Sequence, residues 1–216
     1  MMEALAQRVA AVSFDAAGTL IHTAEPVADV YVRNAHQHGV VVDVETVQAR
    51  FGPAFATAPG RMVGDGRAWW AHVVAHTVGS DNPTLFDALY DHYADPAAWT
   101  VTPGAAEALA ALRASGRPVG LVSNFDSRLR GLLEQLGLRD GLDEVFISGE
   151  HGMEKPDPRA FVWMADRLGV PVTRLLHVGD RMDADVQGAH GAGAMGWHWA
   201  GERANMAVLR TALGVG

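Results

Sequence analysis

The hydrophobic residues of this chain gather in short runs that are separated by longer segments of mixed composition. The runs have the length of buried strands, and glycine, proline and charged residues bound them. Four runs are clear: residues 9–14, 118–123, 144–148 and 175–179. A fifth run, residues 194–199, is a weaker candidate because a glycine interrupts it. The pattern therefore predicts a sheet of four or five strands.

The segments between these runs carry apolar residues at the three- and four-residue spacing of amphipathic helices. Asp157 and Pro158 form a typical helix start, and Thr102 and Pro103 form a similar start as N-cap and first-turn proline. Strands and helices thus alternate along the chain. This alternation predicts an α/β protein with a parallel sheet, right-handed crossovers and helices on both faces.

One long segment, residues 23–99, interrupts the alternation. It shows helical spacing without a strand signal, and its glycine- and proline-rich stretch 51–67 is predicted to be a connector. We expect a core built from residues 1–22 and 100–216, with a helical insertion between them. Because the insertion leaves the core after the first strand, it is suited to cover the carboxyl edge of the sheet.

Composition narrows the class of protein. Acidic residues outnumber basic ones 25 to 17, and no run of Lys or Arg could follow a phosphate backbone, so we expect no nucleic-acid partner. No segment approaches the roughly 18 apolar residues of a membrane span, and the N-terminus lacks the apolar core of a leader. We therefore expect no membrane partner. The absence of cysteine excludes disulfides and thiolate sites and fits a cytoplasmic protein, while the oligomeric state stays open.

Reactive side chains follow four of the predicted strands. They are Asp15 and Thr19; Ser123 and Asn124; Lys155; and Asp180, Asp183 and Asp185. The carboxyl ends of parallel strands meet at one edge of the sheet, so these groups should converge there. Carboxylates, a hydroxyl and an ammonium group together indicate a site for a divalent cation and a phosphoryl group.

The segments that carry these residues resemble the four motifs of the haloacid dehalogenase superfamily. They are FDAAGTL, LVSNFDSRL, GMEKPDP and HVGDRMDADVQGA, in that superfamily's order and spacing. The resemblance covers the whole core and implies its Rossmann-like fold, and the helical insertion is similar to the superfamily's C1 cap. SNFDSRL and GMEKPDPRAF most resemble the branch named for the rhythmically expressed gene 2 protein.

This resemblance implies a Mg²⁺-dependent phosphatase that acts on a small phosphorylated metabolite through an aspartyl-phosphate. It implies that Asp15 is the nucleophile and that Thr19 hydrogen-bonds and orients it. Ser123 and the Asn124 backbone amide would surround the phosphoryl oxygens, and Lys155 would be their counter-charge, fixed by Asp185. The implied Mg²⁺ ligands are Asp15, Asp180 and the Ala17 backbone carbonyl.

Ala17 departs from the superfamily's usual D-x-D-G-T pattern, in which the second aspartate protonates the leaving oxygen. A positioned general acid contributes roughly 10²- to 10⁴-fold to a rate. We therefore expect either a substrate with a good leaving group or an acid from elsewhere in the chain. His22 is the nearest candidate for a substitute acid.

Two other functions stay open. The 2-haloacid dehalogenases also lack the second aspartate, although they usually have tyrosine at the position of Ala17 and S-S-N where this chain has VGD. A non-catalytic binding protein that kept the fold is the other possibility. A phosphonatase is excluded, because its cap lysine has no counterpart in residues 23–99. Three arginines of the insertion could meet an anionic substrate: Arg33, Arg61 and Arg67.

Overall fold

The computed structural model describes residues 2–60 and 62–215; residues 1 and 216 of the predicted core and residue 61 of the predicted insertion lie outside it. A five-stranded sheet forms in the order β5-β4-β1-β6-β7, and every neighbouring pair is parallel. Its strands are β1 (Ala11–Phe14), β4 (Val119–Ser123), β5 (Glu144–Ile147), β6 (Leu175–Gly179) and β7 (Met195–His198). The predicted α/β fold is confirmed, and the weak fifth run forms the edge strand β7.

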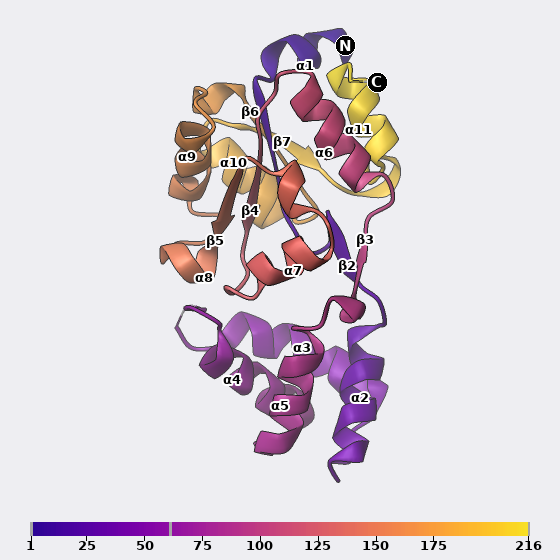
Figure 1. Cartoon of the computed structure of the whole chain (residues 1–216). Coiled ribbons are helices and arrows are strands. Elements are labelled where there is room, and N and C mark those ends of the chain that lie inside the picture. The colour runs from indigo at the N-terminus through magenta and orange to yellow at the C-terminus, as the bar shows by residue number, and fades with distance from the viewer. Residues whose placement is uncertain (1, 61, 216) are drawn as a thin grey trace.

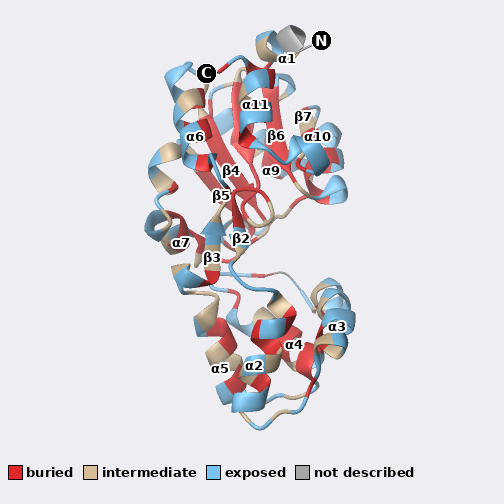
Figure 2. Cartoon of the chain, turned by 90° about the vertical axis from the view of Figure 1, so that its right-hand side faces the viewer, coloured by how far each residue is buried: buried red, intermediate tan, exposed pale blue. Residues whose placement is uncertain are grey.

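Helices cover both faces of this sheet (Figure 1). One face carries α6 (Ala105–Ala114), α7 (Leu129–Gln135) and α11 (Met206–Leu213), and α1 (Met2–Arg8) lies against α11. The other face carries α9 (Pro158–Arg167) and α10 (Gly188–Gly191). Because both faces are covered, the residues of β1, β4 and β6 are all buried, which explains why these strands are continuous apolar runs (Figure 2).

Shorter helical turns connect these elements. They are α8 (Ser148–His151), the 3₁₀ turns Pro96–Ala98, Arg139–Gly141, Val172–Arg174 and Gly201–Arg203, and the π-helical turn Met182–Gln187. The π-helical turn follows β6 directly after Asp180 and Arg181. It therefore belongs to the edge of the sheet where the reactive residues were expected.

The insertion consists of four helices that pack around an apolar cluster of their own. They are α2 (Val27–Gln37), α3 (Val44–Thr57), α4 (Arg67–Val78) and α5 (Pro83–His92). A short antiparallel pair, β2 (Ile21–Thr23) and β3 (Trp99–Val101), joins them to the core. Figure 1 shows the four helices on the side of the sheet opposite to both chain termini.

Two sequence-based expectations about helix limits were wrong. The helix predicted from Thr102 begins at Ala105, because the Thr102 hydroxyl donates to the Thr19 carbonyl at 2.6 Å and so does not cap the helix. The first part of the predicted connector 51–67 is helical, since α3 continues through Pro53 to Thr57 and buries Ala54. The helix start at Asp157 is confirmed, with its carboxylate accepting from the Arg159 amide.

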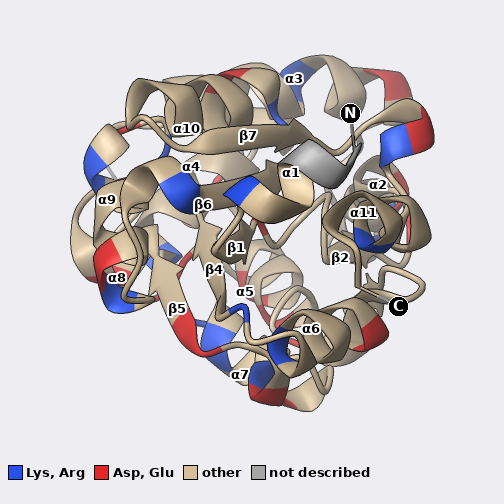
Figure 3. Cartoon of the chain, turned by 90° about the horizontal axis from the view of Figure 1, so that it is seen from above, with Lys and Arg blue, Asp and Glu red and all other residues tan. Residues whose placement is uncertain are grey.

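Charge is distributed around the sheet without a continuous basic stripe. In the view of Figure 3, basic and acidic segments alternate on the helices that surround the strands. Within the described part of the chain, every helix is too short or too polar to cross a bilayer.

A pair of valines tests the packing of the core. Val119 in β4 is fully buried between β1 and the helices, whereas Val41 is 93% exposed. Removing two buried methyl groups and leaving a cavity costs about 2 kcal/mol. We expect Val119→Ala to lower the urea-unfolding free energy by about that amount and Val41→Ala to leave it within about 0.5 kcal/mol of wild type. Equal effects of the two variants would contradict this account of the core.

Candidate active site

The loop after β1 places Asp15 at the carboxyl edge of the sheet. The Asp15 amide donates to the Val178 carbonyl at 2.9 Å, so the start of the loop is anchored to the neighbouring strand β6. The turn then closes through Gly18, whose amide donates to the Ile21 carbonyl at 2.8 Å with φ at +88°. A Cβ atom at Gly18 would lie 2.6 Å from an Asp180 carboxylate oxygen. Only glycine lets this turn approach the second acid so closely.

Lys155 connects two carboxylates at the centre of the site. Its Nζ donates to Asp15 Oδ1 at 2.7 Å and to Asp185 Oδ1 at 2.6 Å, and the side chain is buried. Burial alone would lower the pKa of Lys155, but the two carboxylates outweigh it and hold that pKa above its usual value. The ammonium group is therefore charged and fixed beside Asp15.

Asp185 is held by more than Lys155. Oδ1 also contacts His177 Nε2 at 3.1 Å, and Oδ2 accepts from the Arg181 amide at 2.9 Å. Burial would raise the pKa of Asp185, but the hydrogen bond from His177 and the charge of Lys155 bring it well below the usual range. Asp185 is thus an ionised, fully occupied carboxylate in direct contact with Lys155, the residue that the resemblance implied it would fix.

His177 and Ser13 belong to the same network, and the sequence analysis missed them. They are paired across β1 and β6, and Ser13 Oγ lies 2.9 Å from His177 Nδ1. Burial lowers the pKa of His177, so the ring is neutral. A carboxylate only accepts, so Nε2 carries the hydrogen toward Asp185 and Nδ1 accepts from the Ser13 hydroxyl. The presence of Ser13 and His177, two polar residues inside apolar strands, was the sequence signal that could have revealed this hydrogen-bonded network.

Asn124 has a structural role that the sequence did not indicate. Its Nδ2 donates to the Lys155 carbonyl at 2.8 Å, and its Oδ1 accepts from the Lys155 amide at 2.8 Å. These reciprocal bonds fix the Lys155 segment to the end of β4. Ser123, the last residue of β4, is buried next to this junction.

Thr19 does not form the expected hydrogen bond to Asp15. The Oγ1 atom of Thr19 is buried and has no hydrogen-bond partner among the described residues. Thr19 is held by its backbone instead, since its amide donates to the Ala16 carbonyl at 3.2 Å and its carbonyl accepts from the Thr102 hydroxyl. The turn thus fixes the backbone of Thr19 and leaves the hydroxyl unused.

The acids of the site fit a divalent cation. Carboxylate oxygens of Asp15, Asp180 and Asp185 lie within 4.8 Å of one another. Asp180 Oδ1 is buried without a hydrogen-bond partner among the described residues, and burial together with the charges of Asp15 and Asp185 raises its pKa to about 6. These are the signs of a site that is short of positive charge. Because Asp185 is already occupied, Asp15 and Asp180 are the residues that fit the ion, while Asp183 pairs with Arg181 outside the cluster.

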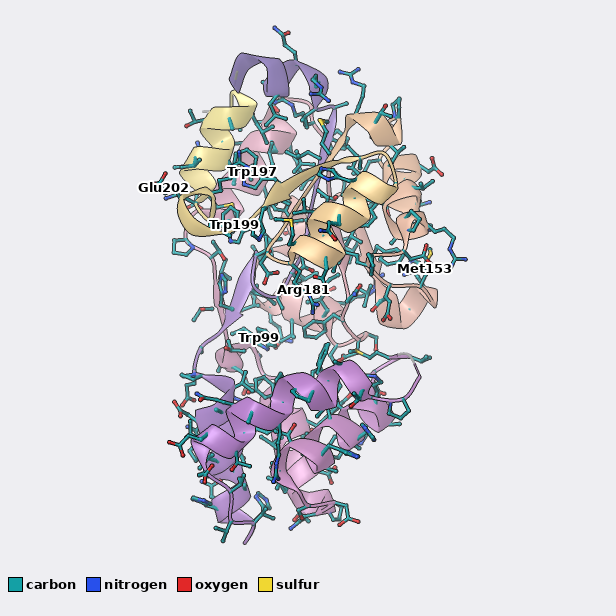
Figure 4. All side chains as sticks on the ribbon, turned by 180° about the vertical axis from the view of Figure 1, so that it is seen from behind. Trp99, Met153, Arg181, Trp197, Trp199 and Glu202 are labelled. Atoms are coloured by element: carbon teal, nitrogen blue, oxygen red, sulfur yellow. The ribbon has the colours of Figure 1, made fainter. Side chains whose placement is uncertain are left out.

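A cavity of about 350 Å³ opens between this loop and the insertion. Its core side is lined by Ala17, Gly18 and Asn124, among others, and His22 in β2 lines it as well. Rings and aliphatic side chains of the helices form the opposite side. Trp99 and Arg181 lie at the end of the core that faces the helices, whereas Trp197 and Trp199 lie deeper in the core (Figure 4).

A sequence model of haloacid dehalogenase-like hydrolases matches residues 9–193, which include all four motifs of the site. The chain belongs to this hydrolase family. The mouse haloacid dehalogenase-like hydrolase domain-containing protein 3 is 35% identical over 84% of this chain and 78% of its own length. A phosphoglycolate phosphatase of Rhodospirillum rubrum is 33% identical over 85% of this chain and 76% of its own length.

Solved structures show the same fold. A dehalogenase in an intermediate complex matches with a TM-score of 0.75 over 97% of this chain and 99% of its own, at 22% identity. The haloacid dehalogenase-like fold predicted from the motifs is therefore confirmed. Both phosphatases and dehalogenases share it, so the chemistry of this chain must be argued from its own residues.

Gly18 provides a test of the geometry around the turn that follows Asp15. Gly18 and Gly39 both have positive φ, but a Cβ atom at Gly39 would meet nothing within 4 Å. Alanine at either position costs about 1–2 kcal/mol of backbone strain. We expect Gly18→Ala to weaken Mg²⁺ binding in titration calorimetry at least tenfold, because it displaces Asp180, while Gly39→Ala affects only stability. Unchanged Mg²⁺ binding in Gly18→Ala would separate Asp180 from the cation site.

Proposed function

We propose that this hydrolase is a Mg²⁺-dependent phosphatase for a small phosphorylated metabolite. The observation that carries the proposal is the buried ammonium group of Lys155, which contacts the Asp15 carboxylate. The Asp180 carboxylate lies close to the same Asp15 group, and its Oδ1 atom has no hydrogen-bond partner among the described residues. A divalent cation supplies the positive charge that this arrangement lacks, and together with Lys155 it provides the counter-charge for a phosphoryl group. We further propose that residues 23–99 act as a cap over a core of residues 1–22 and 100–216, in the cytoplasm.

In this proposal, Asp15 attacks the phosphorus atom and forms an aspartyl-phosphate, while the bond to the leaving oxygen breaks. Water then attacks the phosphorus and releases phosphate, which restores the carboxylate. Lys155 neutralises the phosphoryl oxygens, and Ser123 and the Asn124 amide line their site. Asp15, Asp180 and the backbone carbonyl of Ala17 would hold Mg²⁺, which supplies charge stabilisation at the transferred phosphoryl group.

Dehalogenation is the weaker candidate for this site. Displacement of a halide by a carboxylate needs no cation. It therefore gives no reason for Asp180, a half-buried second acid whose Oδ1 has no partner among the described residues and whose pKa is raised. The R. rubrum relative is named a phosphatase, which agrees with the reading from the charges. The proposed partner is thus a small phosphorylated molecule.

A side-by-side substrate screen tests this choice. We expect phosphate release from aryl and acyl phosphates in the presence of Mg²⁺, loss of that activity with a chelator, and no halide release from 2-haloacids. Halide release without metal would establish the dehalogenase, and inactivity on both substrate classes would establish a binding protein.

Removing the charge of Asp15 tests the covalent step. We expect Asp15→Asn to abolish turnover and to prevent trapping of a phosphorylated enzyme in an acid quench, because an amide oxygen is a poor nucleophile. Circular dichroism and a melting curve check that the variant is folded. Retained turnover in a folded Asp15→Asn protein would exclude Asp15 as the nucleophile.

Ala17 leads to a test of leaving-group dependence. The methyl group of Ala17 lines the cavity where a carboxyl group is usual, so we expect aryl phosphates to be cleaved far faster than alkyl phosphates. Ala17→Asp should raise alkyl phosphate turnover by up to about 10²-fold. Its readout is the slope of log kcat against leaving-group pKa, which should become shallower.

His22 is the control for this test, since it lines the same cavity. If wild type cleaves alkyl esters as fast as aryl esters, an acid already exists, and His22→Ala should remove only the alkyl activity. No change of either substrate class in either variant would show that protonation does not limit the rate, contrary to this proposal.

A further inference from the structure

The cavity between the core and the insertion has walls that are almost entirely apolar. From the helices, Phe51, Phe55 and Phe86 line it, and from the core side Trp99 and Phe125 line it, with their ring centroids 5.8 Å apart. At about 350 Å³, the cavity is large enough for a substituted aromatic ring. The cavity also touches Ala17 and Gly18 of the nucleophile loop. A group that fills the cavity therefore lies next to the loop that carries Asp15.

The described lining has no free positive charge for an anionic substrate. Arg128 is its single guanidinium group, and it is neutralised by the buried carboxylate of Asp126 through bonds of 2.8 Å from Nε and Nη2. Its remaining terminal nitrogen, Nη1, donates to the Tyr90 carbonyl, and the group lies 3.7 Å from the centroid of the Tyr90 ring. The Trp70 indole completes the Asp126 site with a hydrogen bond of 2.9 Å.

Other arginines of the insertion are committed in the same way. Arg33 pairs with Glu25 at 2.6 Å, and Arg67 pairs with Asp87, so neither supplies an unpaired charge; Arg61 lies outside the described residues. Burial raises the pKa of the Tyr31 and Tyr93 hydroxyls, which keeps both phenols in the lining neutral. The described lining thus offers no unpaired guanidinium or ammonium group for a carboxylate and no carboxylate for an amine, and the imidazole of His22 is its remaining basic group.

We propose that the group attached to phosphate in the substrate is a neutral aromatic alcohol, seated in this cavity. The inference rests on the proposed phosphatase function and names its substrate class. Asp15 forms its bond to phosphorus, and the bond from phosphorus to the phenolic oxygen breaks with its electron pair on that oxygen. A phenolate leaves without needing a proton, which agrees with a methyl group at Ala17. A carboxylate in the same cavity would meet no unpaired guanidinium or ammonium group of the described lining, which makes its burial costly.

Two aryl phosphates of matched reactivity test this proposal. They are 4-(carboxymethyl)phenyl phosphate and its methyl ester, in which a methylene group separates the phenolic oxygen from the change of charge. The assay is run with Mg²⁺ at pH 8, where histidine is ordinarily neutral. We expect the wild-type kcat/KM to be about tenfold or more higher for the ester than for the acid, mainly because the KM of the ester is lower. An equal or higher kcat/KM for the acid would overturn the proposal.

A pair of variants on one helix supplies the matched control. Val27 and Val32 are both half-buried residues of α2, but only Val27 lines the cavity. We expect Val27→Arg to reduce the preference for the ester to about equality or to invert it, because an unpaired guanidinium group then meets the carboxylate. Val32→Arg should keep the wild-type preference. The same preference in both variants would contradict the assignment of this cavity.

Binding of the free phenols separates this proposal from the phosphatase proposal. Methyl 4-hydroxyphenylacetate should quench tryptophan fluorescence at a concentration at least tenfold lower than 4-hydroxyphenylacetate does, because Trp70 and Trp99 line the cavity. Preferential binding without hydrolysis of any phosphate would refute the phosphatase and keep the aromatic site. Hydrolysis of both phosphates at equal kcat/KM, with no preference in binding, would keep the phosphatase and refute the aromatic site.

Discussion

The buried ion cluster around Lys155 is the constraint on which the site depends. An ammonium group without water is stable only when carboxylates surround it, and Lys155, the only lysine of the chain, touches Asp15 and Asp185. These partners follow β1 and β6, whereas Lys155 itself follows β5 and is tied to β4 by Asn124. One charge therefore brings together segments from four strands, and losing either carboxylate would leave the other buried charges uncompensated.

Much of this arrangement was predictable, because the fold follows from periodicity and the site follows from strand ends. Asp15, Lys155 and Asp185 were placed correctly, since the carboxyl ends of parallel strands must share one edge. The sequence could not show that Ser13 and His177 face each other, because their partnership depends on the register of β1 against β6. It also could not show the unused hydroxyl of Thr19, because the hydrogen bonds of a turn depend on its backbone geometry.

The contact between the insertion and the core depends on a second, smaller charge cluster. Asp126 lies in the loop after β4, two residues beyond the Asn124 that fixes Lys155, and it receives hydrogen bonds from Trp70 of α4 and from Arg128. Arg128 in turn donates to the Tyr90 carbonyl of α5. The segment that follows β4 thus contacts Lys155 through Asn124 and contacts helices α4 and α5 through Asp126 and Arg128. The same short segment therefore fixes Lys155 and the helices that line the cavity.

Ala17 lines the same cavity as Asn124 and Arg128, and this environment bears on how the proposed reaction could proceed without an acid at position 17. A carboxyl group at this position would lie in a cavity lined by aromatic residues, where its ionised form is poorly solvated and its protonated form is favoured. In the proposed reaction, alanine keeps the cavity wall apolar and leaves the departing oxygen to carry its own charge. The departing group then has to be acidic enough to leave as an anion and apolar enough to enter the cavity. On this proposal, the missing acid and the aromatic walls select the same kind of leaving group.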